Sequence, residues 1–381
     1  MAQLTCCSEV SRSKSERHEA DVTGLPLGHH EQSPAVILAT CDRLIHWLAG
    51  RTHLSNVRGI CVSCQMHGVV QWNKQKVQEE FHSKKLDEMQ FGQNKTGNLV
   101  TWQDKRTLDQ PPNTFGLTGL HAGFGCLTLL SQRETQTENS DWNLWDACGS
   151  IGDLLISLLC DLPHPITSDQ IAHSFGAFDW SENRFDVRLP QDITRRLPLV
   201  KSAGNVAGTL KGYWWGMLPG TPVFCCLGDF QATFFAQYLA DSASVEVDAS
   251  KLWAKLCDPN CSPGPLTIRP LLFGERHEPE ICGSVFGLRD GIQDLSLGAM
   301  ASSICDGIVR NLCEDMLTPS LLAKWGVRKI ILAGQASEPH FRSHIERIYR
   351  DVNFDLVSGG GLDAALGCAR LARQKLQATN N

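Results

Sequence analysis

Several side chains that could do chemistry stand directly after short apolar runs of the sequence. Asp229 follows the apolar run 222–227 through a single glycine and opens a stretch with helical character. In α/β proteins, ligands bind at the carboxyl ends of strands, and a carboxylate there could accept a proton from an attacking hydroxyl. The position is also typical of a helix N-cap, which the local sequence alone favours without excluding the catalytic interpretation.

Two further groups of residues suit the binding of a ligand, and the second of them suits a polyol. Gln65, Met66 and His67 precede a glycine between two apolar runs, as in a ligand-facing turn. Trp102 and Asp104 follow the next apolar run, and together they offer a flat ring for sugar carbons and a carboxylate for hydroxyls. The alternatives are a tight turn with an internally bonded histidine, and a surface ion pair of little energetic value.

The composition excludes several classes of protein. The formal net charge is −6 and there is no basic run, so we predict neither a nucleic-acid partner nor a lipid surface. No apolar run reaches the roughly 20 residues of a membrane helix, and residues 1–32 lack a signal-peptide core. We therefore expect a cytoplasmic protein in which the 16 cysteines are mostly reduced, buried thiols.

The cysteine spacing does not predict a zinc site. Cys61 and Cys64 have CxxC spacing, but residues three apart on a strand face opposite sides of it. A structural zinc ion needs four converging ligands, and no second CxxC is present.

Strands and helices alternate along most of the chain, which indicates an α/β fold. The clearest helix is 34–50, where Ser33 is the candidate N-cap and apolar residues recur every three or four positions. Residues 1–32 are polar and predict loose chain. Residues 73–96 are also polar and predict a loop or an exposed insertion. Other expected helices are 144–159, 248–257, 297–312 and 362–374, and expected strands are 57–62, 99–102, 222–227, 329–333 and 354–357.

The order of the motifs resembles the FGGY carbohydrate kinases, and the resemblance extends from about residue 34 to residue 375. Within that family the likeness is greatest to members that phosphorylate sedoheptulose, a seven-carbon ketose. The motifs that carry it are Ser-Cys-Gln-Met-His-Gly at 63–68, Thr-Trp-Gln-Asp-Lys-Arg at 101–106, Gly-Phe-Gly-Cys at 123–126, Ser-Asp-Gln-Ile-Ala at 168–172, Leu-Gly-Asp-Phe-Gln-Ala at 227–232, Phe-Gly-Glu-Arg-His at 273–277 and Gly-Leu-Asp-Ala-Ala-Leu-Gly at 361–367.

The resemblance implies two actin/hexokinase-like domains of the ribonuclease H type with the site in the cleft between them. It implies a remnant at 1–32, a sugar-binding domain at 33–240 and a nucleotide-binding domain at 241–381. The implied reaction transfers the γ-phosphoryl group of ATP, with Mg²⁺, to the primary hydroxyl of sedoheptulose. The roles that it implies are general base for Asp229, sugar contacts for Gln65, Met66, His67, Trp102 and Asp104, and nucleotide contacts for Gly334 and Ser337, with no residue assigned to the metal.

Two departures from the family pattern affect these expectations. No Asp-x-Gly-Thr turn precedes Ser33, and no second phosphate hairpin follows residue 239. We therefore expect both domains to be incomplete, with the strand at 57–62 left with an unpaired edge. We also expect affinity for the ketose to survive better than affinity for ATP. The alternative function is that of a catalytically inactive sugar-binding or scaffold fragment.

Overall fold

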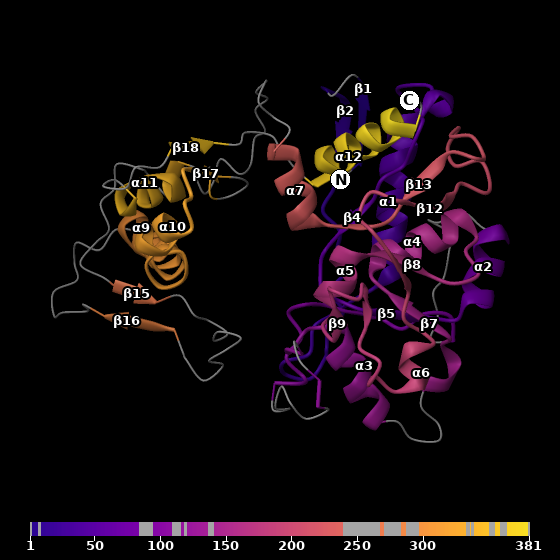
Figure 1. Ribbon diagram of the computed structural model, residues 1–381, viewed down its shortest axis with the longest axis horizontal. Coiled ribbons are helices and arrows are strands. Elements are labelled where there is room, and N and C mark those ends of the chain that lie inside the picture. The colour runs from indigo at the N-terminus through magenta and orange to yellow at the C-terminus, as the bar shows by residue number, and fades with distance from the viewer. Residues whose placement is uncertain are drawn as a thin grey trace. The chain divides into compact units, whose positions relative to one another are not determined.

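The computed structural model describes most of the chain and divides it into two compact units. The first unit comprises Met1–Leu239 and Asp363–Asn381, and the second comprises Ala240–Leu362 (Figure 1). The described residues are 2–6, 9–83, 94–108, 116–117, 120–135, 141–238, 267–269, 283–286, 297–332, 336, 339–349, 355–358 and 364–379.

The first unit alternates helices with short strands, as the sequence predicts for an α/β fold. Its helices are α1 (Pro34–Ala49), α2 (Lys74–Ser83), α3 (Gly125–Glu134), α4 (Ile151–Cys160), α5 (Asp169–Ser174), α6 (Gln191–Thr194), α7 (Asp229–Tyr238) and α12 (Ala364–Thr379). Its paired strands are β1 (Ala2–Cys6) with β2 (Glu9–Lys14), β3 (Glu31–Gln32) with β6 (Leu99–Val100), β4 (Ser63–Cys64) with β14 (Leu227–Gly228), β5 (Val70–Trp72) with β7 (Ala147–Gly149), β8 (Ile166–Ser168) with β11 (Leu199–Lys201), β9 (Phe178–Asp179) with β10 (Arg184–Phe185), and β12 (Val206–Thr209) with β13 (Pro222–Phe224).

Each of these ladders has two strands, and single bridges link some of them. Val69 bridges to Val100, which joins the β5 and β6 regions, and Ile60 bridges to Val223. The regular strand predicted over 57–62 is wrong, because only Ile60 in that stretch forms a bridge, to Val223. Ile60 donates to the carbonyl of Pro222 and accepts from Phe224, at 2.9 Å each, and the Val62 carbonyl accepts from the Leu227 N–H at 3.0 Å, so this stretch is paired on one side.

The prediction of loose chain over residues 1–32 is wrong for the two strands β1 and β2. They form an antiparallel hairpin with an irregular register between Leu4 and Thr5. The hairpin lies against α1 and α12, so its support comes from distant parts of the chain. The local sequence has no apolar run that would reveal such support.

The prediction of an exposed loop over residues 73–96 is also wrong in part, because α2 lies within it. Val77 is buried and Phe81 packs beside it against the main core. Glu80 is buried as well and pairs with Lys95 at 2.7 Å. Two apolar residues at a spacing of four are enough to anchor one face of this helix, although its composition is polar.

The predicted helix at 34–50 is confirmed as α1. Pro34 is its first residue, and it ends at Gly50. Ser33 occupies the N-cap position as predicted, but its side chain makes no capping hydrogen bond. The apolar face of α1 packs into the main core through Ile37, Leu38 and Cys41.

The last helix belongs to the first unit, although the sequence assigns it to a domain at 241–381. Helix α12 packs along α7, and a Cβ atom at Gly367 would collide with the backbone of Ala232 (Figure 1). Only glycine permits this close approach of two helix backbones. This tertiary contact returns the chain to the first unit after residue 362.

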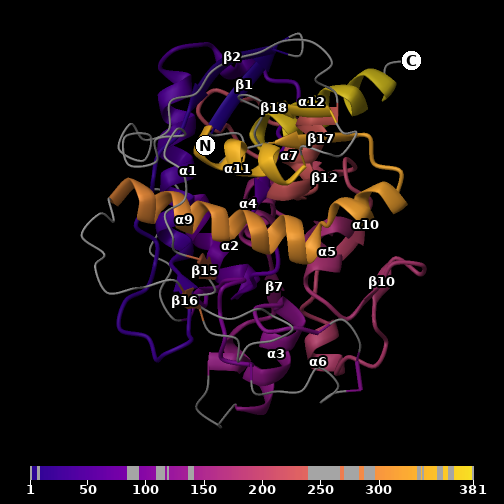
Figure 2. The same cartoon turned by 90° about the vertical axis from the view of Figure 1, so that its left-hand side faces the viewer.

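The second unit is built around α9 (Leu297–Arg310), which is seen lengthwise in Figure 2. A π-helical turn (Asn311–Met316), α10 (Pro319–Lys324) and α11 (Pro339–Ile348) follow, β17 (Lys329–Leu332) pairs in parallel with β18 (Asp355–Ser358), and β15 (Thr267–Arg269) pairs with β16 (Ser284–Phe286). The predicted strands at 329–333 and 354–357 and the helix at 297–312 are confirmed within a few residues. The helix predicted at 248–257 lies outside the described residues.

A polar network joins α9 to α11 within the second unit. Asp306 accepts hydrogen bonds from Arg310, at 2.8 Å, and from Arg347. His344 is buried, and its Nδ1 lies 3.2 Å from the same carboxylate. Burial alone would raise the pKa of Asp306, but the hydrogen bonds from His344 and Arg310 hold that pKa well below its usual value.

The N-terminus of α4 holds a buried carboxyl group. Asp153 accepts a hydrogen bond from the Ser150 N–H at 2.8 Å, and the Ser150 hydroxyl accepts from the Asp153 N–H at 3.1 Å. This capping box explains why α4 starts at residue 151 and not at 144, together with β7, which occupies 147–149. Burial raises the pKa of Asp153 to about 7 in spite of the hydrogen bonds from Ser150.

We predict that Asp153 makes the folded chain less stable as the pH rises from about 4 to about 7. The Asp153 carboxyl ionises near pH 4 in the unfolded state, whereas it stays protonated up to about pH 7 in the folded state. Raising the pH between these values therefore stabilises the unfolded state relative to the folded one. The maximum loss is about 4 kcal/mol. In urea unfolding across this range, the unfolding free energy of wild type should fall relative to that of Asp153→Asn as the pH rises. A difference in unfolding free energy that does not change with pH would contradict the prediction.

Candidate functional site

The parallel pairing of β4 with β14 brings two predicted site residues to one edge of the structure. Ser63 pairs with Leu227 and Cys64 with Gly228. Gln65 and Asp229 are the next residues on the two strands, so both lie at the carboxyl ends of neighbouring parallel strands. This is the position at which ligands bind in α/β proteins.

Asp229 is the first residue of α7 and is exposed. Its carboxylate accepts a hydrogen bond from the adjacent Phe230 N–H at 2.9 Å. An N-cap side chain would instead accept from an N–H two or three residues further on, so the geometry differs from the cap that the sequence left open. Gly228, directly before it, has no side chain and lets Met66 approach, since an added Cβ would lie 2.8 Å from the Met66 sulfur.

His67 is held by two elements that are distant in the sequence. Its backbone lies in the left-handed region, with φ of 69°. Its ring stacks on Phe124 with 4.4 Å between centroids, and its Nδ1 lies 2.7 Å from the backbone carbonyl of Ser174 at the end of α5. Because a carbonyl oxygen only accepts, Nδ1 carries the proton in the neutral ring and Nε2 carries the acceptor lone pair.

Trp102 presents a partly exposed ring, with 46% of its surface accessible. Its backbone rests against Gly123, where φ is +79° and an added Cβ would collide with the Trp102 carbonyl. Gly68 similarly approaches the backbone of Val100 and Thr101. Two glycines therefore bring the Trp102 loop close to the Gln65–Gly68 turn.

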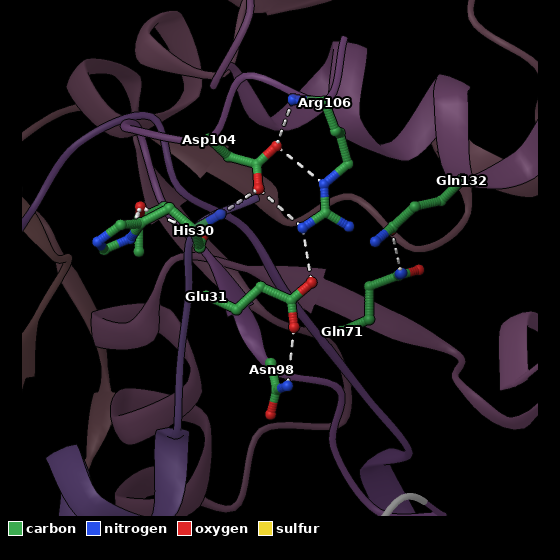
Figure 3. Close-up of polar contacts among 8 residues, drawn as sticks. His30, Glu31, Gln71, Asn98, Asp104, Arg106 and Gln132 are labelled. Atoms are coloured by element: carbon green, nitrogen blue, oxygen red, sulfur yellow. Dashed lines mark hydrogen bonds and ion pairs between the residues drawn. The ribbon is translucent and has the colours of Figure 1, made fainter. Parts of the chain in front are cut away.

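Asp104, for which the resemblance implies a sugar contact, is buried and hydrogen-bonded within the protein. It is only 2% exposed. One oxygen accepts from the Arg106 N–H and Nε at 3.0 and 2.8 Å, and the other accepts from the His30 N–H at 2.7 Å and from Arg106 Nη2 at 2.8 Å (Figure 3). Four protein donors already occupy its carboxylate, so its role is to hold the Trp102 loop.

Arg106 extends this network to β3. Its Nη2 also donates to Glu31 at 2.6 Å, and Glu31 accepts from the Asn98 side chain at 2.8 Å (Figure 3). The guanidinium is thus shared by two carboxylates and is largely buried. Burial alone would lower the pKa of Arg106, but the hydrogen bonds to Asp104 and Glu31 raise it. The alternative of a weak surface ion pair does not describe this group, because it is neither exposed nor isolated.

Gln65 is connected through side-chain hydrogen bonds to residues that precede Ser33. Its Nε2 donates to Gln32 Oε1 at 2.8 Å, and Gln32 Nε2 donates to Asp21 at 2.8 Å. Asp21 and Gln32 are also joined by an antiparallel backbone bridge. Residues before Ser33 therefore contribute to the site.

The structure does not place the predicted nucleotide contacts. Gly334 and Ser337 lie outside the described residues, as does the motif at 273–277. The part of the chain that is described contains no group of three or more potential metal ligands. Cys61 and Cys64 contact different thiols, Cys368 and Cys226 respectively.

Sequence reasoning missed several residues that shape this edge. Phe124 and Ser174 hold the His67 ring, and Asp21 and Gln32 orient Gln65. Phe124 lies within the Gly-Phe-Gly-Cys motif at 123–126, so the family resemblance could have indicated that it belongs to the site. Nothing in the local sequence around Asp21 or Gln32 indicates a link to Gln65, since the contact spans 33 residues.

Comparison with known proteins identifies relatives of the chain. The human sedoheptulokinase is 28% identical over an alignment that covers 97% of this chain and 91% of the human protein. The mouse sedoheptulokinase is 26% identical, with 98% and 91% covered. The chain is a homologue of the sedoheptulokinases. No protein-family model matches it.

A solved structure supports the same relationship at the level of the fold. The ligand-bound xylulose kinase of Lactobacillus acidophilus superposes with a TM-score of 0.70 at 17% identity, covering 98% of this chain and 86% of that one. The resemblance to the FGGY carbohydrate kinases, with their two actin/hexokinase-like domains, is thereby confirmed.

The relatives carry segments that this chain lacks. The alignment with the mouse protein runs over 451 positions, whereas the chain has 381 residues, so at least 70 aligned positions have no residue here. In the described residues, no helix has the length and apolar character needed to cross a bilayer.

We predict that Gly123→Ala destabilises the fold more than Gly116→Ala does. Both glycines have positive φ, but an added Cβ at Gly116 meets open space, whereas at Gly123 it meets the Trp102 backbone. Gly116→Ala should cost about 1 kcal/mol from backbone strain alone. Gly123→Ala should cost about 1–3 kcal/mol more from overpacking.

The two variants form a matched pair for measurement by urea unfolding of the full chain. Equal losses of unfolding free energy would show that Gly123 does not set the approach of the Trp102 loop.

Proposed function

We propose that this chain is a carbohydrate kinase that transfers the γ-phosphoryl group of ATP to the primary hydroxyl of sedoheptulose. The observation that carries the proposal is the shared edge of β4 and β14, where Gln65, Met66 and His67 lie beside Asp229. Homology to the sedoheptulokinases supports the same activity and the choice of a seven-carbon ketose.

The proposed mechanism uses Asp229 as the general base. The primary hydroxyl oxygen of the ketose attacks the γ-phosphorus, and the bond from that phosphorus to the β–γ bridging oxygen breaks, so that ADP leaves. The hydroxyl proton passes to the Asp229 carboxylate, which is exposed and contacts no cation among the described residues. Such proton transfer contributes about 10²–10⁴-fold to rate.

The other residues of the edge bind and orient the sugar in this proposal. The exposed ring of Trp102 packs on carbon atoms, and the Nε2 atom of His67 accepts a hydrogen bond from a sugar hydroxyl. Met66 packs against Gly228 and so forms the apolar surface next to Asp229. Asp104 acts indirectly, because it holds Arg106 and the loop that carries Trp102.

ATP and Mg²⁺ are part of the proposal. Mg²⁺ is usually held by one or two carboxylates together with substrate phosphates and water, and the proposal assigns no described residue to the ion, because Asp229 serves as the general base. The ion would neutralise charge that develops on the phosphates. Gly334 and Ser337 stay proposed contacts for the nucleotide, and a cytoplasmic location stays a proposal as well.

An inactive sugar-binding or scaffold protein is the second candidate. The observation in its favour is that at least 70 aligned positions of the mouse relative have no residue in this chain. Homology to named kinases favours the active enzyme. Calorimetric titration with sedoheptulose and with Mg-ATP separately distinguishes the two, because a pure sugar-binding protein would bind only the ketose.

We expect purified wild type to release ADP when sedoheptulose and Mg-ATP are supplied together, and Asp229→Asn to be slower by about 10²–10⁴-fold. The matched control is Asp192→Asn on α6, which removes the ion pair with Arg133 on α3 and should leave the rate unchanged. Sedoheptulose binding should persist in Asp229→Asn. An Asp229→Asn rate equal to that of wild type would sink the proposed mechanism.

A further inference from the structure

Helix α5 has a buried serine at each end, and each serine holds a different part of the site edge. Ser168 is the N-cap of the helix and Ser174 is its last residue. The helix lies beside β8 and β14 (Figure 1). The motif at 168–172 is one of those that carry the family resemblance, and the mechanism above gives it no role.

Ser174 holds His67 at two points. Its hydroxyl oxygen accepts a hydrogen bond from the His67 backbone N–H at 3.1 Å, and its carbonyl accepts from the ring Nδ1 at 2.7 Å. The same hydroxyl donates to the Ile171 carbonyl at 2.8 Å, which leaves its lone pairs for His67. Since His67 has a φ of 69°, which non-glycine residues adopt rarely, the Ser174 hydroxyl holds a strained turn in place.

Ser168 holds the strand that leads to Asp229. Its hydroxyl donates to the Cys226 carbonyl at 2.5 Å and accepts from the Ile171 N–H at 3.3 Å. Cys226 directly precedes β14 and stands three residues before Asp229. One hydroxyl therefore caps α5 and at the same time fixes the approach to the proposed general base.

The helix between the two serines is itself held in place. Ile171 is fully buried in the core. Asp169 accepts from the Ala203 N–H at 3.0 Å, just beyond β11. The carbonyl of Phe175, directly after the helix, accepts from the Cys126 N–H at 2.9 Å in α3. Because α5 is anchored along its whole length, it acts as a spacer between the strand before Asp229 and the turn that carries His67.

Resting on the proposed function, we infer that α5 sets the separation between the general base and the sugar-binding turn, and that Ser168 and Ser174 are positioning residues for phosphoryl transfer. Both hydroxyls are engaged with protein groups, so they act through other residues. Proton transfer requires the sugar hydroxyl to lie within hydrogen-bond reach of Asp229. Ser174 acts on sugar binding through His67, whereas Ser168 acts on the chemical step through the strand before Asp229.

Steady-state kinetics of the full chain with sedoheptulose and Mg-ATP separates the two roles. Ser174→Ala should raise the KM for sedoheptulose about two- to tenfold with a smaller change in kcat, because the restraint on His67 is lost. Ser168→Ala should lower kcat about tenfold with a smaller change in KM. Ser174→Thr and Ser168→Thr keep the hydroxyl and should restore the affected constant.

The matched control is Ser157→Ala on α4. Its hydroxyl is buried and has no hydrogen-bond partner among the described residues, so its loss should leave KM and kcat unchanged. Urea unfolding of every variant identifies any that fails to fold, and the threonine variants keep the comparison possible in that case. The same ratio of KM to kcat in Ser168→Ala, Ser174→Ala and wild type would overturn the inference.

Amide hydrogen exchange tests the Ser174 contact without any activity. The His67 N–H, read by fragmentation mass spectrometry, should exchange at least about tenfold faster in Ser174→Ala than in Ser157→Ala. Equal exchange in these two variants would overturn the inference even if the kinase is active. Wild type that phosphorylates no ketose would instead overturn the proposed function, and with it the catalytic part of the inference.

Discussion

Two residues of parallel pairing between β4 and β14 determine where the functional side chains of this chain can meet. The pairing joins segments that are more than 160 residues apart, as the contact between Cys64 and Cys226 shows. Parallel strands cannot be linked by a short turn, so everything between them must fold as a crossover that covers the sheet. The positions of α3, α4 and α5 are part of that crossover.

The helix behind this pair must approach very closely. Gly152 of α4 faces the sulfur atoms of Cys226 and Cys64, and an added Cβ would collide with the first of them. The two sulfurs lie 3.4 Å apart, and the hydrogen bond with Cys64, together with burial, raises the pKa of the Cys226 thiol. The buried thiols therefore act as small packing groups that let α4 support the strand edge, rather than as metal ligands.

The loops at this edge are positioned by buried polar groups. Asp104 has four protein donors, and Arg106 joins it to Glu31 on β3. A buried ion pair that is fully hydrogen-bonded contributes less to net stability than to a unique arrangement of the chain, because removing either partner would leave an unpaired buried charge. The consequence for function is that the loop carrying the exposed Trp102 ring is held in one position.

The sequence by itself determined the α/β alternation, the family resemblance and the identity of most residues at the edge. These depend on local patterns: apolar runs, a helix period in 34–50, and short motifs that keep their order along the chain. Asp229, Gln65, Met66, His67 and Trp102 were all identified in this way. Only the tertiary structure decided which groups each of them contacts there. The four hydrogen bonds that Asp104 accepts from His30 and Arg106 could not be read from the sequence. The hairpin at residues 2–14, α2 and the return of α12 to the first unit could not be read from it either. The physical reason is that their support comes from contacts between residues far apart in the sequence, which no local pattern records. The orientation of the Gln65 side-chain amide also depends on such a distant contact. Gln65 donates to Gln32, and Gln32 donates to the carboxylate of Asp21, 44 residues before Gln65.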